Sequence, residues 1–190
     1  MDESLFYLGE NVSQESDWLV EQAIPEDAEA LAYMHGESFK DTYLNDDETH
    51  NAQVLAEAAA FVTPERLQQR IELIHHALTH SDKEFYVTVN NDHGIPAGFL
   101  YGYKDADTQE LSALYVSKAY HGTGVAQALT TQFIDWCDRD KPIEVGVVID
   151  NERAQRFYQK ICFHATGTAH ESFYPFLEET KMILPERGDK

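Results

Sequence analysis

The stretch that decides the fold is LSALYVSKAYHGTGVAQAL, residues 111–129. An apolar segment with strand character leads into a short bend that contains Gly122 and Gly124, and a helical pattern begins at Val125. Glycine lets the backbone approach a ligand closely, and the first N–H groups of a helix have no partner within that helix. Such a turn is suited to binding anions. The run therefore predicts a site for a phosphate-bearing ligand.

Two common phosphate loops do not fit this spacing. A P-loop has four residues between its glycines and a Lys-Ser/Thr pair after the second. Here only Thr123 separates the two glycines, and no lysine follows. A dinucleotide-binding fingerprint needs a third glycine or alanine at the position of Gln127, and it does not have the five residues that lie here between strand and glycine. Both of these loops are therefore poor matches.

A second motif lies in VGVVIDNERAQRFYQKICF, residues 145–163. It consists of a strand, Asn-x-x-Ala from Asn151 to Ala154, and a helix that ends in a Phe-Tyr-x-Lys sequence. Together the two motifs resemble the GNAT superfamily of N-acetyltransferases, in which the first motif is Gln/Arg-x-x-Gly-x-Gly/Ala. His121 departs from that pattern at its first position. The resemblance extends from about Trp18 to Leu184.

The resemblance implies an α/β fold, in which helices flank a central mixed, mostly antiparallel sheet. We expect one GNAT acetyltransferase domain over residues 18–190, preceded by an N-terminal extension at residues 1–17. The implied activity moves an acetyl group from acetyl-CoA to a primary amine, by direct attack in a ternary complex. The amine belongs to a polyamine-like small molecule or to a peptide or protein. The alternative is an acyl-CoA-binding sensor or interaction module that does not turn over.

The same resemblance predicts how the donor binds. The backbone of the central strand pairs with the pantetheine arm, and the N–H groups of the glycine turn meet the pyrophosphate. His121 titrates near neutrality, so we expect cofactor affinity to fall as pH rises. Asn151 caps the following helix or contacts the cofactor, and capping alone also explains it. The predicted cofactor-binding residues are Leu114, Tyr115, Val116, His121, Gly122, Thr123, Gly124, Val125, Ala126, Gln127, Asn151, Ala154 and Tyr158.

Two residues are the candidates for catalysis. An acceptor ammonium with a pKa near 10.4 must lose a proton before it attacks, and Glu110 stands where several lysine-acetylating members carry their glutamate. Tyr158 matches the tyrosine that in many members protonates the departing sulfur. The alternatives are a solvated strand-end carboxylate for Glu110 and core packing for Tyr158.

The acceptor region is expected between residues 37–43 and residues 173–176. Phe39, Tyr43, Phe173 and Tyr174 are its candidate contacts. Acidic side chains nearby are suited to attracting a cationic acceptor, or they form a solvated loop. These acidic residues are Asp41, Asp46, Asp47 and Glu48.

Composition limits the other partners. The net charge of −20 argues against nucleic acid, and no apolar run is long enough to span a bilayer. Cys137 and Cys162 are expected to be buried free thiols, and an acidic start without a signal peptide favours the cytoplasm. His76 and His80 have helical spacing but no zinc-protease glutamate, so no metal is expected. A monomer and a homodimer both stay open.

The positive charges near the two motifs suggest where phosphate binds, although a solvated helix face explains three of them equally well. They are Lys118, Arg153, Arg156 and Lys160. Along the chain, hydrophobic periodicity and turn residues predict the order of elements. Strands are expected at 18–23, 85–89, 95–103, 111–116, 143–149, 163–170 and 179–184, with helices from 25, within 37–80, after Gly124 and after Asn151.

Overall fold

The computed structural model describes residues 18–91, 94–170 and 172–188. The N-terminal extension predicted at residues 1–17 lies outside the described residues. Seven strands form a single sheet in the order β1-β2-β3-β4-β5-β7-β6, and every pair is antiparallel except β4 with β5. The strands are β1 Trp18–Gln22, β2 Glu84–Asn91, β3 Pro96–Lys104, β4 Gln109–Val116, β5 Ile143–Val148, β6 His164–His170 and β7 Glu179–Leu184. The predicted mixed, mostly antiparallel sheet is confirmed.

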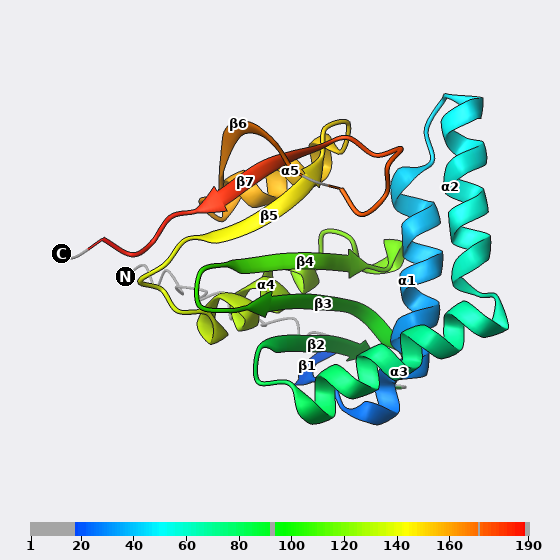
Figure 1. The fold of residues 1–190 in the computed structure, drawn as a ribbon, viewed down its shortest axis with the longest axis horizontal. Coiled ribbons are helices and arrows are strands. Elements are labelled where there is room, and N and C mark those ends of the chain that lie inside the picture. The colour runs from blue at the N-terminus through cyan, green and yellow to red at the C-terminus, as the bar shows by residue number, and fades with distance from the viewer. Residues whose placement is uncertain (1–17, 92–93, 171, 189–190) are drawn as a thin grey trace, which may run out of the picture.

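Five α-helices flank this sheet (Figure 1). They are α1 Ala28–Tyr43, α2 Glu48–Phe61, α3 Pro64–His80, α4 Val125–Trp136 and α5 Glu152–Lys160, with short 3-10 turns η1 Pro25–Asp27 and η2 Lys118–Tyr120. The segment between residues 37 and 80 was expected to hold two or three helices. It breaks at the predicted Asn45–Asp47 turn and at Thr63. Thr63 occupies the N-cap position of α3, but its hydroxyl donates to the Ala60 carbonyl at 3.0 Å instead of capping the helix.

The core lies on both faces of the sheet, because successive side chains of a strand point to opposite faces. On β3, Leu100 packs in the cluster that includes Phe133 of α4, whereas Phe99 packs in the cluster under α1 and α3. Helix α4 approaches β3 closely at Gly102, where a Cβ atom would lie 2.3 Å from the Phe133 ring. Glycine at this position therefore lets α4 seat against the sheet beside the start of β4.

The two cysteines differ in their environment. Cys137 follows α4 and is buried, while Cys162 is exposed, so the expectation that both thiols are buried was wrong for Cys162. Cys162 stands just after α5 in the left-handed region, with φ of 71°. The Cys162 N–H donates to the Gln159 carbonyl and the Phe163 N–H to the Tyr158 carbonyl. This pair of bonds is a Schellman ending, which turns the Cys162 side chain outward while Phe163 enters the core.

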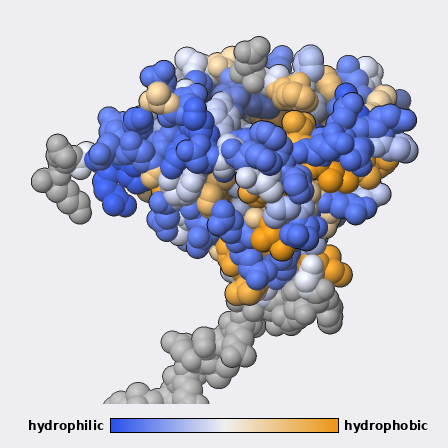
Figure 2. Space-filling view, turned by 60° about the horizontal axis from the view of Figure 1, so that its bottom comes forward, coloured by the Kyte–Doolittle hydropathy of each residue, from blue (hydrophilic) through white to orange (hydrophobic). Residues whose placement is uncertain are grey.

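The face of the molecule in Figure 2 is mostly hydrophilic, with hydrophobic residues gathered in patches. Among the described residues, no helix has both the length and the apolar character needed to cross a membrane.

Candidate active site

Strands β4 and β5 pair only at their beginnings. The parallel register holds for Glu110 with Glu144 and for Leu111 with Val145, and it does not continue along β4. A cavity of about 580 Å³ occupies the space beyond, between the later part of β4, the end of β5 and helix α5. The β5-facing edge of β4 therefore offers main-chain groups to an extended ligand, as an unpaired strand edge does.

We call this cavity the donor cavity. The turn that contains Gly122 and Gly124 forms one end of it. Gly122 and Gly124 have φ of 80° and 93°, and a Cβ at Gly122 would meet no atom within 4 Å. Helical bonding on α4 begins with the Ala128 N–H, which donates to the Gly124 carbonyl at 2.9 Å. Within the described part of the chain, no acceptor receives the N–H groups of residues 124–127. The turn thus presents several free donors at a helix N-terminus, which suits a pyrophosphate.

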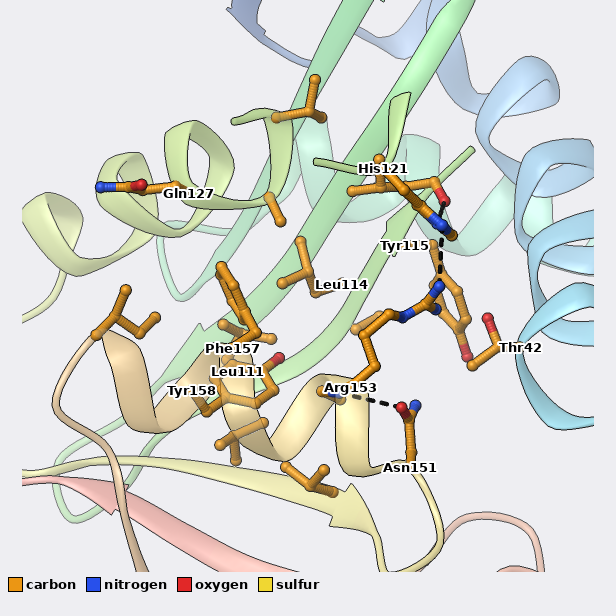
Figure 3. Close-up of a pocket in the computed structure, with 18 of the residues that line it drawn as sticks. Thr42, Leu111, Leu114, Tyr115, His121, Gln127, Asn151, Arg153, Phe157 and Tyr158 are labelled. Carbon is orange, nitrogen blue, oxygen red and sulfur yellow. Dashed lines mark hydrogen bonds between the residues drawn. The ribbon is translucent and has the colours of Figure 1, made fainter. Parts of the chain in front are cut away.

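His121 connects this turn to the neighbouring helix α5. Its Nε2–H donates to the Val116 carbonyl at 3.0 Å, and its Nδ1 accepts from Arg153 Nη1 at 2.9 Å. Figure 3 shows the Arg153 guanidinium reaching His121 across the cavity. Because Nδ1 accepts, this arrangement suits a neutral imidazole, and the positive charge here belongs to Arg153. The fall of cofactor affinity with rising pH stays a prediction.

Two of the four predicted basic residues line the donor cavity, and two do not. Arg153 and Lys160 line the donor cavity. Arg156 lies on an exposed face of α5 and pairs with Glu152 at 2.8 Å, and neither Arg156 nor Lys118 lines the cavity.

Tyr158 lies on α5 with its ring packed against Phe157 and Phe163. The residue is only 5% exposed, yet it lines the donor cavity, and no described residue makes a hydrogen bond with its hydroxyl (Figure 3). Burial raises the pKa of this hydroxyl above its usual value, and the nearby Tyr43 adds to the effect. The Tyr158 hydroxyl consequently stays protonated and can donate into the cavity.

Asn151 accepts a hydrogen bond from the Ala154 N–H at 3.1 Å, so the predicted helix cap is confirmed. Of the predicted cofactor residues, only Thr123 does not line the donor cavity, because its hydroxyl turns back to the Tyr120 carbonyl at 2.8 Å. The residues that do line it are Leu114, Tyr115, Val116, His121, Gly122, Gly124, Val125, Ala126, Gln127, Asn151, Ala154 and Tyr158.

A second cavity of about 1130 Å³ adjoins the first, and we call it the acceptor cavity. The two cavities share part of their lining at the middle of β4 and at Gly146 of β5. Two ligands held in the two cavities could therefore meet at this point. The shared residues are Tyr43, Leu111, Ser112, Ala113, Tyr115 and Gly146.

Three of the four predicted acceptor contacts line the acceptor cavity, and one does not. Tyr43, Phe173 and Tyr174 line the acceptor cavity, but Phe39 is fully buried and packs against the rings of Tyr43 and Tyr174. Phe39 therefore supports this wall from behind and cannot touch a ligand there. None of the four acidic residues proposed to attract a cation, at positions 41, 46, 47 and 48, lines either cavity. Asp47 instead caps α2 by accepting from the His50 N–H at 2.8 Å.

Glu110 lies in the acceptor cavity, at the start of β4. Its Oε2 accepts from the Tyr103 hydroxyl at 3.0 Å and lies 3.7 Å from His170 Nε2. His170 Nδ1 lies 3.1 Å from Glu179 Oε2. Glycine at position 146 leaves room for this pair, because a Cβ there would lie 2.2 Å from Glu179 Oε2 and would displace that carboxylate.

These three neighbours of Glu110 were missed by sequence reasoning. Tyr103, His170 and Glu179 come from β3, β6 and β7, and no local motif connects them. Strand pairing alone brings them together, and Glu110 thereby becomes part of a carboxylate–imidazole–carboxylate group that can accept a proton.

The acceptor cavity is also lined by a half-buried histidine, His35 of α1. Its ring packs against those of Phe61, Phe99 and Tyr115, and its Nδ1 is hydrogen-bonded to Arg70 Nη1. Burial, together with the charge of Arg70, lowers the pKa of His35 to about 3. This imidazole is therefore neutral in the folded protein at physiological pH.

The pKa of His35 predicts an acid-dependent loss of stability. The unfolded chain takes up this proton below its ordinary pKa of about 6.5, whereas the folded chain does so only near 3. The contribution of neutral His35 to the free energy of unfolding is therefore fully present above pH 6.5. It is lost progressively as the pH falls from 6.5 toward 3. Between pH 7 and pH 5 the loss should reach about 2 kcal/mol.

Urea unfolding at the two pH values measures this loss. The change in unfolding free energy should be about 2 kcal/mol smaller in His35→Phe than in the wild type. His164→Gln, which removes an exposed histidine of β6, should keep the wild-type change. Equal changes in the wild type and His35→Phe would show that His35 does not carry the effect.

Comparison with known proteins agrees with this geometry. The family model described as "Acetyltransferase (GNAT) family" matches residues 51–162, which is more than half of the chain. An uncharacterized N-acetyltransferase of Mycobacterium bovis is 40% identical over 81 residues, covering 37% of this chain and 51% of the relative. An uncharacterized N-acetyltransferase of Mycobacterium tuberculosis matches to the same extent. The chain thus spans about half the length of these curated relatives.

Solved structures show the same fold at low sequence identity. The PaiA N-acetyltransferase from Thermoplasma acidophilum, in complex with coenzyme A, has a TM-score of 0.65 at 18% identity, covering 88% of this chain and 98% of that one. The spermidine N-acetyltransferase from Vibrio cholerae, in complex with CoA and spermine, has a TM-score of 0.62 at 15% identity, covering 90% and 96%. With the family match over both motifs, these findings lead to one conclusion: the chain belongs to the GNAT acetyltransferase family.

Proposed function

We propose that this protein is an N-acetyltransferase that moves an acetyl group from acetyl-CoA to a primary amine. The acceptor amine belongs to a small molecule, such as a polyamine, or to a peptide or protein. The observation that carries the proposal is the meeting of two cavities at the middle of β4, with Tyr158 in one and Glu110 in the other. Transfer then occurs by direct attack while both substrates are bound.

The donor cavity fits acetyl-CoA in its chemistry. The free N–H groups of residues 124–127 and the Arg153 guanidinium are suited to the pyrophosphate. The edge of β4 from Leu114 to Val116 has no partner strand and is suited to hydrogen bonds with the pantetheine amides, although the Val116 carbonyl already accepts from His121. When bound, acetyl-CoA supplies a thioester whose carbonyl carbon is the electrophile. A metal takes no part in this proposal, and the described residues contain no cluster suited to one.

The residues of the chain divide the proton transfers between them. Glu110 accepts the proton of the acceptor ammonium, directly or through water, and His170 lies beside it as a second acceptor. A neutral amine is then free to attack. Tyr158 Oη holds the proton that the departing sulfur needs, since burial keeps its pKa high while a thiol has a pKa near 8.5. Both free cysteines are consistent with a cytoplasmic location, which we also propose.

Release of the CoA thiol across a panel of amines tests the proposal. Spermidine, a lysine-containing peptide and an aminoglycoside should be compared with a sample that lacks amine. Thiol release that depends on an amine supports the enzyme. Binding of acetyl-CoA without release for any amine would contradict it and favour the acyl-CoA sensor.

Arg153→Gln is expected to weaken CoA binding about tenfold, because a charge-assisted hydrogen bond to phosphate contributes roughly 1.5–3 kcal/mol. Arg156→Gln provides a matched control, since Arg156 lies on the same helix but pairs with Glu152 on its exposed face. Isothermal titration calorimetry of both variants with CoA measures the difference. Equal dissociation constants for Arg153→Gln and Arg156→Gln would remove Arg153 from the phosphate site.

A further inference from the structure

Arg70 of α3 places a positively charged guanidinium in the acceptor cavity. Its guanidinium lies 4.3 Å above the Phe61 ring and is hydrogen-bonded to His35 Nδ1, and it lies near the Tyr174 hydroxyl. Among the ion pairs of the described residues, none includes Arg70. By contrast Arg66, which lines the same cavity, pairs with Glu57 at 2.6 Å.

The partners of Arg70 hold it without neutralising it. Burial and the Arg70 charge lower the pKa of His35 to about 3, so this imidazole is neutral. Burial raises the pKa of Tyr174 to about 12, so this hydroxyl is neutral as well. A guanidinium has five N–H donors, more than the bond with His35 uses. The full charge and further donors of Arg70 thus remain available in a half-buried place.

The far end of the acceptor cavity has the opposite charge. Strand pairing sets Tyr103 of β3 beside Glu84 and Glu110, whereas Phe99 of β3 lies beside Tyr115 and contacts His35. Tyr103 and Phe99 are about 13 Å apart at the usual strand rise of about 3.3 Å per residue. The cavity is therefore polarised, with Glu84 and Glu110 at one end and Arg70 at the other. The Glu57 carboxylate, which also lines the cavity and acts on Tyr174, is paired with Arg66.

We propose that Arg70 binds a carboxylate of the acceptor, whose amine lies at the Glu110 end, so that the acceptor is an amino acid. A guanidinium matches a carboxylate in a two-bond fork, which gives both affinity and orientation. A polyamine offers nothing to Arg70 and would bring an ammonium group against it. This inference rests on the proposed function and narrows its acceptor class.

Pairs of amines that differ only in a carboxylate test this inference. Suitable pairs are lysine with cadaverine and 6-aminohexanoate with pentylamine. In the full chain with acetyl-CoA, kcat/KM should be at least about tenfold higher for the carboxylate-bearing member of each pair. Arg70→Gln should abolish this preference by raising KM for the amino acid.

Two further variants separate binding from folding. Arg70→Lys keeps the charge without the fork and should keep part of the preference. Arg66→Gln, whose native residue is already paired with Glu57, should keep all of it. The preference of the wild type for the carboxylate-bearing amine can be measured even if a variant fails to fold. Equal kcat/KM for both members of each pair, or an undiminished preference in folded Arg70→Gln, would overturn the assignment.

Calorimetric binding of lysine and cadaverine in the presence of CoA separates this inference from the proposed function. Tighter binding of lysine that depends on Arg70, without turnover of any amine, would keep the carboxylate site and overturn the acetyltransferase. Turnover of both amines without any preference would keep the acetyltransferase and overturn the carboxylate site.

Discussion

Tyr158→Phe is expected to lower the kcat of amine acetylation about 100-fold, the lower range of what one proton donor contributes. The hydroxyl faces the donor cavity without a hydrogen bond to any described residue, so its removal leaves no partner unsatisfied. The ring, which packs against Phe157 and Phe163, is retained. Stability and CoA affinity should therefore change little.

Steady-state thiol release and CoA titration of the Tyr158→Phe variant measure the two parts of this prediction. Tyr33→Phe makes the same chemical change on the exposed side of α1, where it lines neither cavity, and should retain wild-type kinetics. An unchanged kcat in Tyr158→Phe would reduce Tyr158 to a packing residue, which was the alternative from its helical spacing.

Glu110→Gln is expected to lower kcat/KM about 100-fold at pH 7, because an amine with a pKa near 10.4 is neutral there only about once in several thousand molecules. The amide keeps a hydrogen bond with Tyr103, so the change acts on proton acceptance more than on packing. As pH rises, more of the amine loses its proton to solvent. The difference between Glu110→Gln and the wild type should therefore shrink toward pH 10.

A pH profile of kcat/KM for both proteins checks this prediction. Glu72→Gln, an exposed change on α3, controls for the loss of one negative charge. A constant ratio between Glu110→Gln and the wild type at every pH would argue that Glu110 does not accept the proton. Full activity of the variant at pH 7 would transfer that role to His170, which lies 3.7 Å away.

The local parts of the donor site could be predicted from sequence because their chemistry depends on neighbours in the chain. The positive φ of Gly122 and Gly124 and the Asn151 cap follow from residues a few positions apart. The order of strands and helices follows in the same way from periodicity and turn residues.

The acceptor side could not be predicted in this way. The contacts of Glu110 with His170, and of Arg70 with His35, join residues that are 60 and 35 positions apart, and only the packing of sheet and helices brings them together. Phe39 illustrates the same limit. The pattern placed it in the right region, but only the packed structure shows that Tyr43 and Tyr174 separate it from the cavity.

Initial rates measured while both acetyl-CoA and an accepted amine are varied test the central claim most directly, since the meeting of two cavities implies that both substrates are bound at once. Direct transfer between two bound substrates predicts double-reciprocal lines that intersect, and a protein whose mass is unchanged after incubation with acetyl-CoA alone. Parallel lines, together with a protein that has gained one acetyl group, would contradict it.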